Sequence, residues 1–166
     1  MKRIFIFVIS LSATLMAVGV GKTLPSVTLS GTTGGTADGK AWHTKSLKGA
    51  TRLILYMDPD QRKNIEPLMR EIRRKSSPKF TTIAIINLAA TWMPNRVLIS
   101  KLNASKNKTK HTTYLFDKKR VLVAKWGLPD ESTSVMVTAA SGRVKYVKHG
   151  ALSSSDVSKI LKVLSR

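Results

Sequence analysis

The chain has 166 residues, a length that favours one domain, and its 29 Lys and Arg against nine Asp and Glu give a formal net charge of +20. It contains no cysteine, which excludes disulfides, thiolate chemistry, Cys-ligated metal and lipid attachment through Cys. The charge favours polyanionic partners. The alternative is a general lysine bias that serves no dedicated partner.

The first 20 residues have the pattern of a secretion signal. Lys2 and Arg3 precede an apolar run over residues 4–20. No Ala-x-Ala is present, but residues 19–21 are Gly-Val-Gly, so we predict a signal peptide over 1–21 and a mature domain over 22–166. The alternative is an uncleaved membrane anchor, although the run is slightly short of the ~20 residues that a spanning helix needs. With the signal cleaved, no stable membrane span is expected.

Export also changes the partners that the charge implies. For a cytosolic protein with this charge, nucleic acid would be the first candidate partner. For an exported protein we expect no nucleic acid. The candidates are an envelope protein, including an acidic one, anionic lipid head groups, or an anionic envelope polymer such as lipopolysaccharide or a cell-wall polymer.

The start of the mature chain predicts a β-hairpin. Residues 22–36 are rich in Gly, Ser and Thr, and residues 24–29 alternate weakly, as in an edge strand. Residues 37–40 form a turn signal with Asp-Gly at its centre. Trp42, Thr44 and Leu47 follow, and the hairpin leads into the next strand.

A strand, a sharp turn and an amphipathic helix come next, and we call this turn the elbow. The strand is the apolar run 53–57. Asp58 is a helix cap, Pro59 suits the first helical position, and Gln61 has the place of the reciprocal capping-box residue. One apolar stripe follows at helical spacing, on Ile65, Leu68, Met69 and Ile72. Pro67 lies inside this helix and is expected to kink it.

The remaining elements alternate between strands and helices. We predict strands over 80–88, 112–116, 134–138 and 143–148. A helix is expected to begin at 93–94 and to bury Val97, Leu98 and Leu102. A short helix over 118–126 is expected to end at Gly127, and Ser153 or Ser154 is expected to cap the last helix. The order β-α-β-α-β-α-β-β-α predicts an α/β fold with a mixed sheet and helices on both faces.

Three stretches resemble the thioredoxin-like fold in its exported peroxiredoxin or thiol-reductase form. They are residues 53–56 with the helix that contains Pro67, residues 114–117 through 125–128, and residues 135–137 through 142–144 and 150–152. Within that superfamily, residues 79–87, 126–137 and 142–152 resemble the YtfJ family of bacterial periplasmic proteins. The resemblance covers roughly residues 24–164. It implies a three-layer α/β/α sandwich with a mixed central sheet and an N-terminal hairpin extension, a periplasmic location, and no established activity.

The elbow is where thiol–disulfide enzymes of this fold carry a cysteine whose thiolate the helix N-terminus stabilises. If Pro67 sets the register, the two Cys positions fall at Pro59 and Arg62; if the strand sets it, they fall within 61–64. Neither register has a Cys, and residues 57–75 have no Ser or Thr nucleophile. The cis-proline position of the fold falls at Ser132, where a trans bond is expected because a non-proline cis bond costs ~3 kcal/mol.

We therefore interpret the elbow as a recognition surface at a degenerate active-site position. Its residues are Asp58, Pro59, Asp60, Arg62, Lys63 and Ser132. The predicted role is binding or structural, without thiol–disulfide activity. The alternatives are a non-thiol, metal-assisted enzyme and charge-driven attachment to an anionic polymer.

Other candidate chemistry is weak. His43, His111 and His149 lie in separate segments, and the spacing of the methionines does not suggest a soft-metal site, so we assign no metal and no cofactor. Asp58 and Asp60 fit a weak cation site, but helix capping explains them more simply.

Two basic regions stand out. Residues 70, 73, 74 and 75 are basic and suit the C-terminal dipole of their helix, and a second group of Lys and Arg flanks the strand over 112–116. Tyr114 and Phe116 alternate on one face of that strand, which favours core packing over base stacking.

Overall fold

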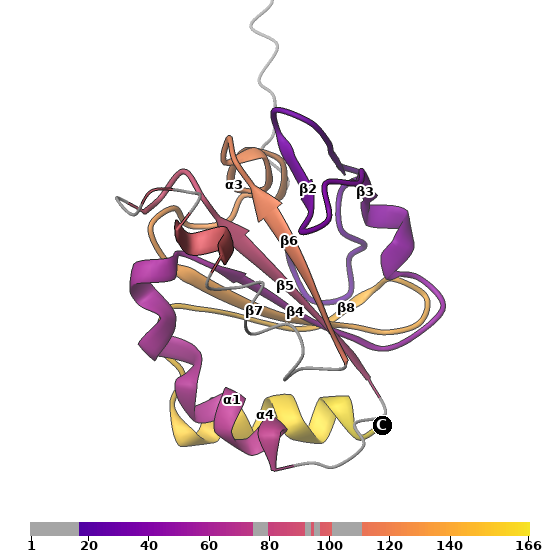
Figure 1. Ribbon diagram of the computed structural model, residues 1–166. Coiled ribbons are helices and arrows are strands. Elements are labelled where there is room, and N and C mark those ends of the chain that lie inside the picture. The colour runs from indigo at the N-terminus through magenta and orange to yellow at the C-terminus, as the bar shows by residue number, and fades with distance from the viewer. Residues whose placement is uncertain (1–16, 75–79, 92–93, 95–96, 101–110) are drawn as a thin grey trace, which may run out of the picture.

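A computed structural model describes residues 17–74, 80–91, 94, 97–100 and 111–166. Its centre is a six-stranded mixed sheet with the order β2-β6-β5-β4-β7-β8 (Figure 1). The strands are β2 (Gly34–Thr36), β4 (Arg52–Met57), β5 (Thr81–Asn87), β6 (Thr112–Asp117), β7 (Thr133–Thr138) and β8 (Val144–His149). β4, β5 and β6 are parallel, whereas β2, β7 and β8 each run antiparallel to their neighbours. The mixed sheet predicted from the sequence is confirmed.

The N-terminal hairpin is a separate two-stranded sheet. β1 (Thr28–Leu29) pairs antiparallel with β3 (Trp42–His43), in the register Thr28 to His43 and Leu29 to Trp42. The short 3₁₀ helix η1 (Thr44–Leu47) then leads towards β4. Between the two hairpin strands the chain reaches across to the edge of the main sheet and forms β2, which the sequence did not predict.

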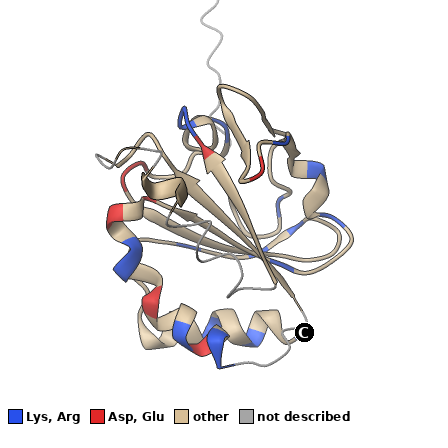
Figure 2. Ribbon diagram, viewed as in Figure 1, with Lys and Arg blue, Asp and Glu red and all other residues tan. Residues whose placement is uncertain are grey.

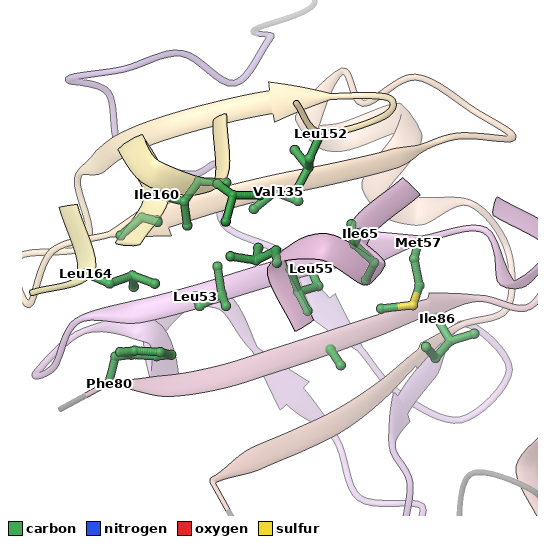
Figure 3. Close-up of a cluster of buried hydrophobic side chains, with 14 of the residues drawn as sticks. Leu53, Leu55, Met57, Ile65, Phe80, Ile86, Val135, Leu152, Ile160 and Leu164 are labelled. Atoms are coloured by element: carbon green, nitrogen blue, oxygen red, sulfur yellow. The ribbon is translucent and has the colours of Figure 1, made fainter. Parts of the chain in front are cut away.

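Helices cover the two faces of the sheet. On one face lie η2 (Pro59–Ile65), α1 (Glu66–Arg73) and α4 (Ser154–Leu164). In the core beneath them, Leu53, Leu55 and Val135 from the strands meet Ile160 of α4 (Figure 3). Leu68 of α1 belongs to the same core, and all five side chains are fully buried. Because successive side chains of a strand point to opposite faces, a single apolar run such as β4 supplies two cores.

The second core lies on the opposite face, between the sheet, α3 (Val121–Trp126) and the N-terminal hairpin. Ile54 and Tyr56 of β4 contribute to it. The rings of Trp42 and Trp126 meet edge to face with centroids 6.4 Å apart, and the indole nitrogen of Trp126 donates to the Pro25 carbonyl at 3.0 Å. This is the three-layer α/β/α sandwich expected from the sequence.

The segment before the hairpin is bonded to this second face. The amide of Val18 donates to the Trp126 carbonyl at 3.0 Å, and that of Gly21 donates to the Val144 carbonyl at 2.8 Å. Residues 1–16 of the predicted leader lie outside the described residues. Within the part of the chain that the structure describes, no helix is both long and apolar enough to span a bilayer.

Several local predictions are confirmed. Ser153 caps α4 through a reciprocal capping box with Asp156, and Gly127 ends α3 in the left-handed conformation at φ 63°. Phe116 is buried and Tyr114 packs against the same core, as their alternation predicted.

Two helix predictions are wrong in detail. Pro67 does not kink a continuous α-helix, because residues 59–65 are 3₁₀ and α1 begins at Glu66, so Pro67 lies in the first turn, where its missing N–H is not needed. In the helical residues 97–100, Leu98 is buried but Val97 is 44% exposed. Leu102 lies outside the described residues.

Candidate functional site

The elbow is held by backbone hydrogen bonds across the end of the sheet. The Asp58 side chain accepts from the Asp60 amide at 2.9 Å, as the cap prediction required. The Asp58 amide donates to the Ser132 carbonyl at 3.1 Å. Ser132 therefore faces the elbow, as the fold resemblance implied. This bond also replaces the predicted capping box, because Gln61 instead accepts from the Asn64 side chain at 3.4 Å.

The elbow presents polar side chains around one buried carboxylate. Asp58 is only 3% exposed, whereas Asp60, Arg62 and Lys63 are exposed. Pro59 and Ser132 are half-buried, and the described residues contain no cis peptide bond. The six predicted surface residues thus share one corner of the fold. Whether a partner binds there stays a prediction.

Acidic residues gather at this corner although the chain is strongly basic. Burial raises the pKa of Asp58, and the charges of Asp60, Glu131 and Asp130 raise it further, while the hydrogen bond from the Asp60 amide lowers it. Four of the nine acidic residues of the chain therefore lie close together here. We call Asp58, Asp60, Asp130 and Glu131 the acidic rim; Figure 2 shows acidic segments around this corner of the molecule.

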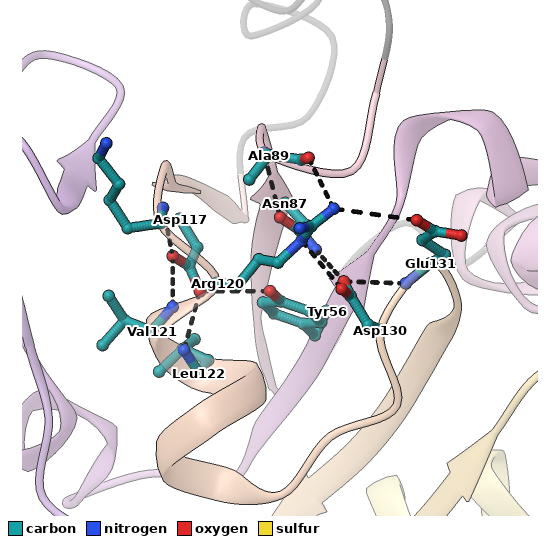
Figure 4. A network of polar contacts seen from close by, with 10 residues as sticks. Tyr56, Asn87, Ala89, Asp117, Arg120, Val121, Leu122, Asp130 and Glu131 are labelled. Carbon is teal, nitrogen blue, oxygen red and sulfur yellow. Dashed lines mark hydrogen bonds and ion pairs between the residues drawn. The ribbon is translucent and has the colours of Figure 1, made fainter.

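Beneath the rim, Asp117 is the centre of a buried network at the ends of the parallel strands (Figure 4). One of its carboxylate oxygens accepts from the amides of Lys119 (3.2 Å) and Val121 (2.9 Å). The other accepts from the Leu122 amide (2.8 Å) and the Tyr56 hydroxyl (3.2 Å). Asp117 therefore satisfies the free amides at the start of α3 and ties them to β4.

Arg120 connects this network to the rim. Its guanidinium pairs with Asp130 at 2.9 Å and with Glu131 at 3.9 Å, and donates to the Ala89 carbonyl at 3.0 Å. Asn87, at the end of β5, donates to Asp130 at 3.2 Å. Three loops that follow three different elements are thus joined beside the elbow.

The backbone of this region is strained at two positions. Arg120 (φ 54°) and Glu131 (φ 50°) are the only non-glycine residues with positive φ among those described. A left-handed conformation at such residues costs roughly 1–2 kcal/mol and persists only where surrounding contacts hold it. Both residues belong to the group of contacts among Asn87, Ala89, Arg120, Asp130 and Glu131, which we call the Arg120 cluster. These contacts hold the rim in one conformation.

This network was not predicted from the sequence. The signal that could have indicated it was the position of the polar residues Asn87, Asp117 and Asp58 at the carboxyl ends of apolar strands, because these ends lie together in a parallel sheet. Arg120 and Asp130 carried no local signal.

The histidines do not form a common site. His149 shares a 2.8 Å hydrogen bond with the Ser134 hydroxyl, and burial lowers the pKa of His149. Because Ser134 is fully buried, a substrate does not reach its hydroxyl. His43 bonds Thr28 at 2.8 Å, and His111 is exposed. The described part of the chain has no group of three His, Asp or Glu residues with the geometry of a metal site.

The sheet order and the elbow define a protein of the thioredoxin-like class. A thiol peroxidase from Chromobacterium violaceum superposes with a TM-score of 0.65 at 19% identity, covering 90% of this chain and 87% of that one. A pneumococcal exposed lipoprotein thioredoxin from Streptococcus pneumoniae gives 0.58 at 14% identity, with 84% and 98% covered. At these identities the likeness concerns the fold.

The family assignment is more specific. Residues 18–166 match the family described as "Bacterial protein of unknown function (YtfJ_HI0045)", and the chain belongs to this family. The uncharacterised protein YtfJ of Escherichia coli K12 is 24% identical over 132 residues, covering 76% of this chain and 72% of the relative. An uncharacterised protein of Haemophilus influenzae is 26% identical over 130 residues, covering 75% and 70%. The family predicted from the sequence is confirmed.

Proposed function

We propose that this chain is an exported, periplasmic binding protein of the YtfJ family that has no thiol–disulfide activity and uses its elbow to recognise an envelope protein. One observation carries the proposal. The thioredoxin-like elbow is retained with its backbone bonds, but the chain has no cysteine. Disulfide exchange proceeds by attack of a thiolate, so a redox role at this position lacks its reactive group.

The acidic rim indicates the chemistry of the partner surface. Asp60, Asp130 and Glu131 are exposed on a protein whose net charge is +20. Although Asp130 and Glu131 share Arg120, exposed carboxylates favour pairing with a positively charged segment and disfavour polyanions at the same place. The proposed partner surface is therefore a Lys- or Arg-containing segment of an envelope protein.

Site-specific crosslinking in the native envelope tests this. A photo-reactive residue at Arg62, on the exposed side of η2, is expected to give a discrete adduct that persists at moderate salt. The same probe at Lys159, an exposed position on α4, is the control. Equal adducts from both positions, or none from Arg62, would refute elbow recognition.

Variants that each remove one negative charge then distinguish recognition by the acidic rim from attraction by the net charge of the whole protein. Asp60→Asn and Glu131→Gln each remove one exposed negative charge from the rim, and Asp38→Asn removes one from the distant hairpin turn. Only the rim variants are expected to weaken the Arg62 adduct. If all three have the same effect, the charge of the whole protein and not the elbow determines binding.

A second candidate, charge-driven attachment to an anionic envelope polymer, is favoured by the net charge alone. Such binding disappears as salt shortens the Debye length. The non-thiol, metal-assisted enzyme has no supporting cluster among the described residues. Stoichiometric metal in purified protein would favour it. Mass spectrometry of the exported chain tests cleavage near Gly21.

A further inference from the structure

A groove lies between α1 and α4, at the far end of the η2–α1 segment from the elbow. Its volume is about 650 Å³. α1 contributes Pro67, Arg70, Glu71 and Arg73, Arg74 follows directly after α1, and α4 contributes Ser154 and Val157. Val157 is buried in the core below, so the groove has an apolar floor with guanidinium groups along one wall. In Figure 2, basic segments of both helices lie together at this edge of the molecule.

The three arginines differ in their partners. Arg73 pairs with Glu66, and Arg74 pairs with Glu71 at 3.4 Å. The Arg70 side chain is exposed and forms no ion pair or hydrogen bond with another described residue. Exposed ion pairs of this kind contribute only about 0–1 kcal/mol, so an incoming anion displaces them at little cost.

The opposite wall also favours negative charge. Ser154 is the first residue of α4, and the N-terminus of a helix carries a partial positive charge. The Ser153–Asp156 capping box uses part of this potential. With two glutamates against three arginines, the α1 wall keeps one net positive charge, which Arg70 provides.

We infer that this groove binds a phosphate group, with Arg70 as the principal ligand and Arg73 as the second. Guanidinium groups bind phosphate through paired N–H donors, a geometry that lysine does not reproduce. The groove is wider than a phosphate ion, and its apolar floor at Pro67 and Val157 suits the organic body of a phosphate ester. The site is separate from the elbow and does not depend on the proposed elbow recognition.

Titration of the complete exported protein with sodium phosphate, followed by NMR of the arginine side-chain N–H groups, tests the site. Saturable shifts are expected for Arg70 and Arg73. Arg70→Gln is expected to weaken binding by about tenfold or more, the effect of losing a charge-assisted hydrogen bond. The charge-matched control Lys159→Gln, on an exposed α4 position that does not line the groove, is expected to change it by less than about twofold because salt screens distant charges.

Phosphatidylcholine vesicles with and without phosphatidylglycerol distinguish the sources of the phosphate. If the protein floats with the anionic vesicles, and if free phosphate inhibits this flotation and Arg70→Gln abolishes it, the site binds a lipid headgroup. Phosphate binding without flotation assigns it to a soluble or polymeric phosphate ester. Equal losses for Arg70→Gln and Lys159→Gln, or shifts that do not saturate, would overturn the inference.

Discussion

Replacing Asp117 with Asn tests whether the buried network holds the site together. In the wild type, two carboxylate oxygens receive four hydrogen bonds, three from backbone amides and one from Tyr56. The asparagine side chain has one oxygen and one amino group. With the amino group on the side of Leu122 and Tyr56, the Leu122 amide loses its acceptor, whereas the Tyr56 hydroxyl accepts from the amino group instead of donating. Asp117 is fully buried, and water does not replace the lost acceptor.

The expected loss is large relative to the stability of a domain. One lost bond to a charged group, at ~1.5–3 kcal/mol, gives a decrease of about 1.5–3 kcal/mol in the free energy of unfolding, out of the roughly 5–15 kcal/mol that is usual. Equilibrium urea unfolding at neutral pH measures it. Hydrogen exchange is expected to rise first at Leu122, whose amide loses its acceptor.

Two controls calibrate the measurement. Tyr56→Phe removes only one of the four bonds and is expected to cost about 1 kcal/mol. Asp38→Asn changes the same chemical group at an exposed position and is expected to cost less than ~0.5 kcal/mol. A loss below about 1 kcal/mol for Asp117→Asn would contradict the role given to the carboxylate.

Three further changes test other parts of the structure. Because the pKa of Asp58 is raised in the folded state, its stabilising contribution is complete below the unfolded value of 3.8 and is lost as pH rises through the folded pKa. Asp58→Asn keeps the capping oxygen and is therefore expected to be more stable than wild type at neutral pH. In unfolding titrations this difference is expected to shrink as pH falls towards 4. Gly34→Ala places a Cβ 1.9 Å from the Phe116 carbonyl oxygen at φ +140°, and is expected to detach β2, seen as faster hydrogen exchange along the β6 edge while exchange in β4 is unchanged. Ser153→Ala removes the α4 cap and is expected to lower the free energy of unfolding by about 0.5–2 kcal/mol, with Ser155→Ala as the matched control that leaves it nearly unchanged.

Much of the site scaffold was predictable because its signals are local. The apolar run of β4, the Asp58 cap and the Pro59 start follow from short-range preferences that hold wherever a buried strand leads into a helix. The position of Ser132 opposite the elbow was predicted by counting from Gly127 without gaps along the fold that the sequence resembles, and the hydrogen bond from the Asp58 amide to the Ser132 carbonyl agrees with it. The Arg120 cluster was not predictable, because its members come from three loops and have no spacing in common.

The sequence by itself determined most of the strands and helices, although not β2, and it excluded thiol chemistry. Hydrophobic periodicity, caps and the absence of cysteine are properties of neighbouring residues or of composition, and they do not depend on what packs against them. The tertiary structure decided which donors and acceptors form hydrogen bonds with one another and which side chains lie side by side. The Asp58 amide bonds Ser132 and not Gln61, Gly34 pairs with a strand that follows more than 70 residues later, and the arginines of α1 become a groove wall because α4 returns beside them. These contacts join distant segments, and only the packed sheet brings their donors and acceptors within bonding distance.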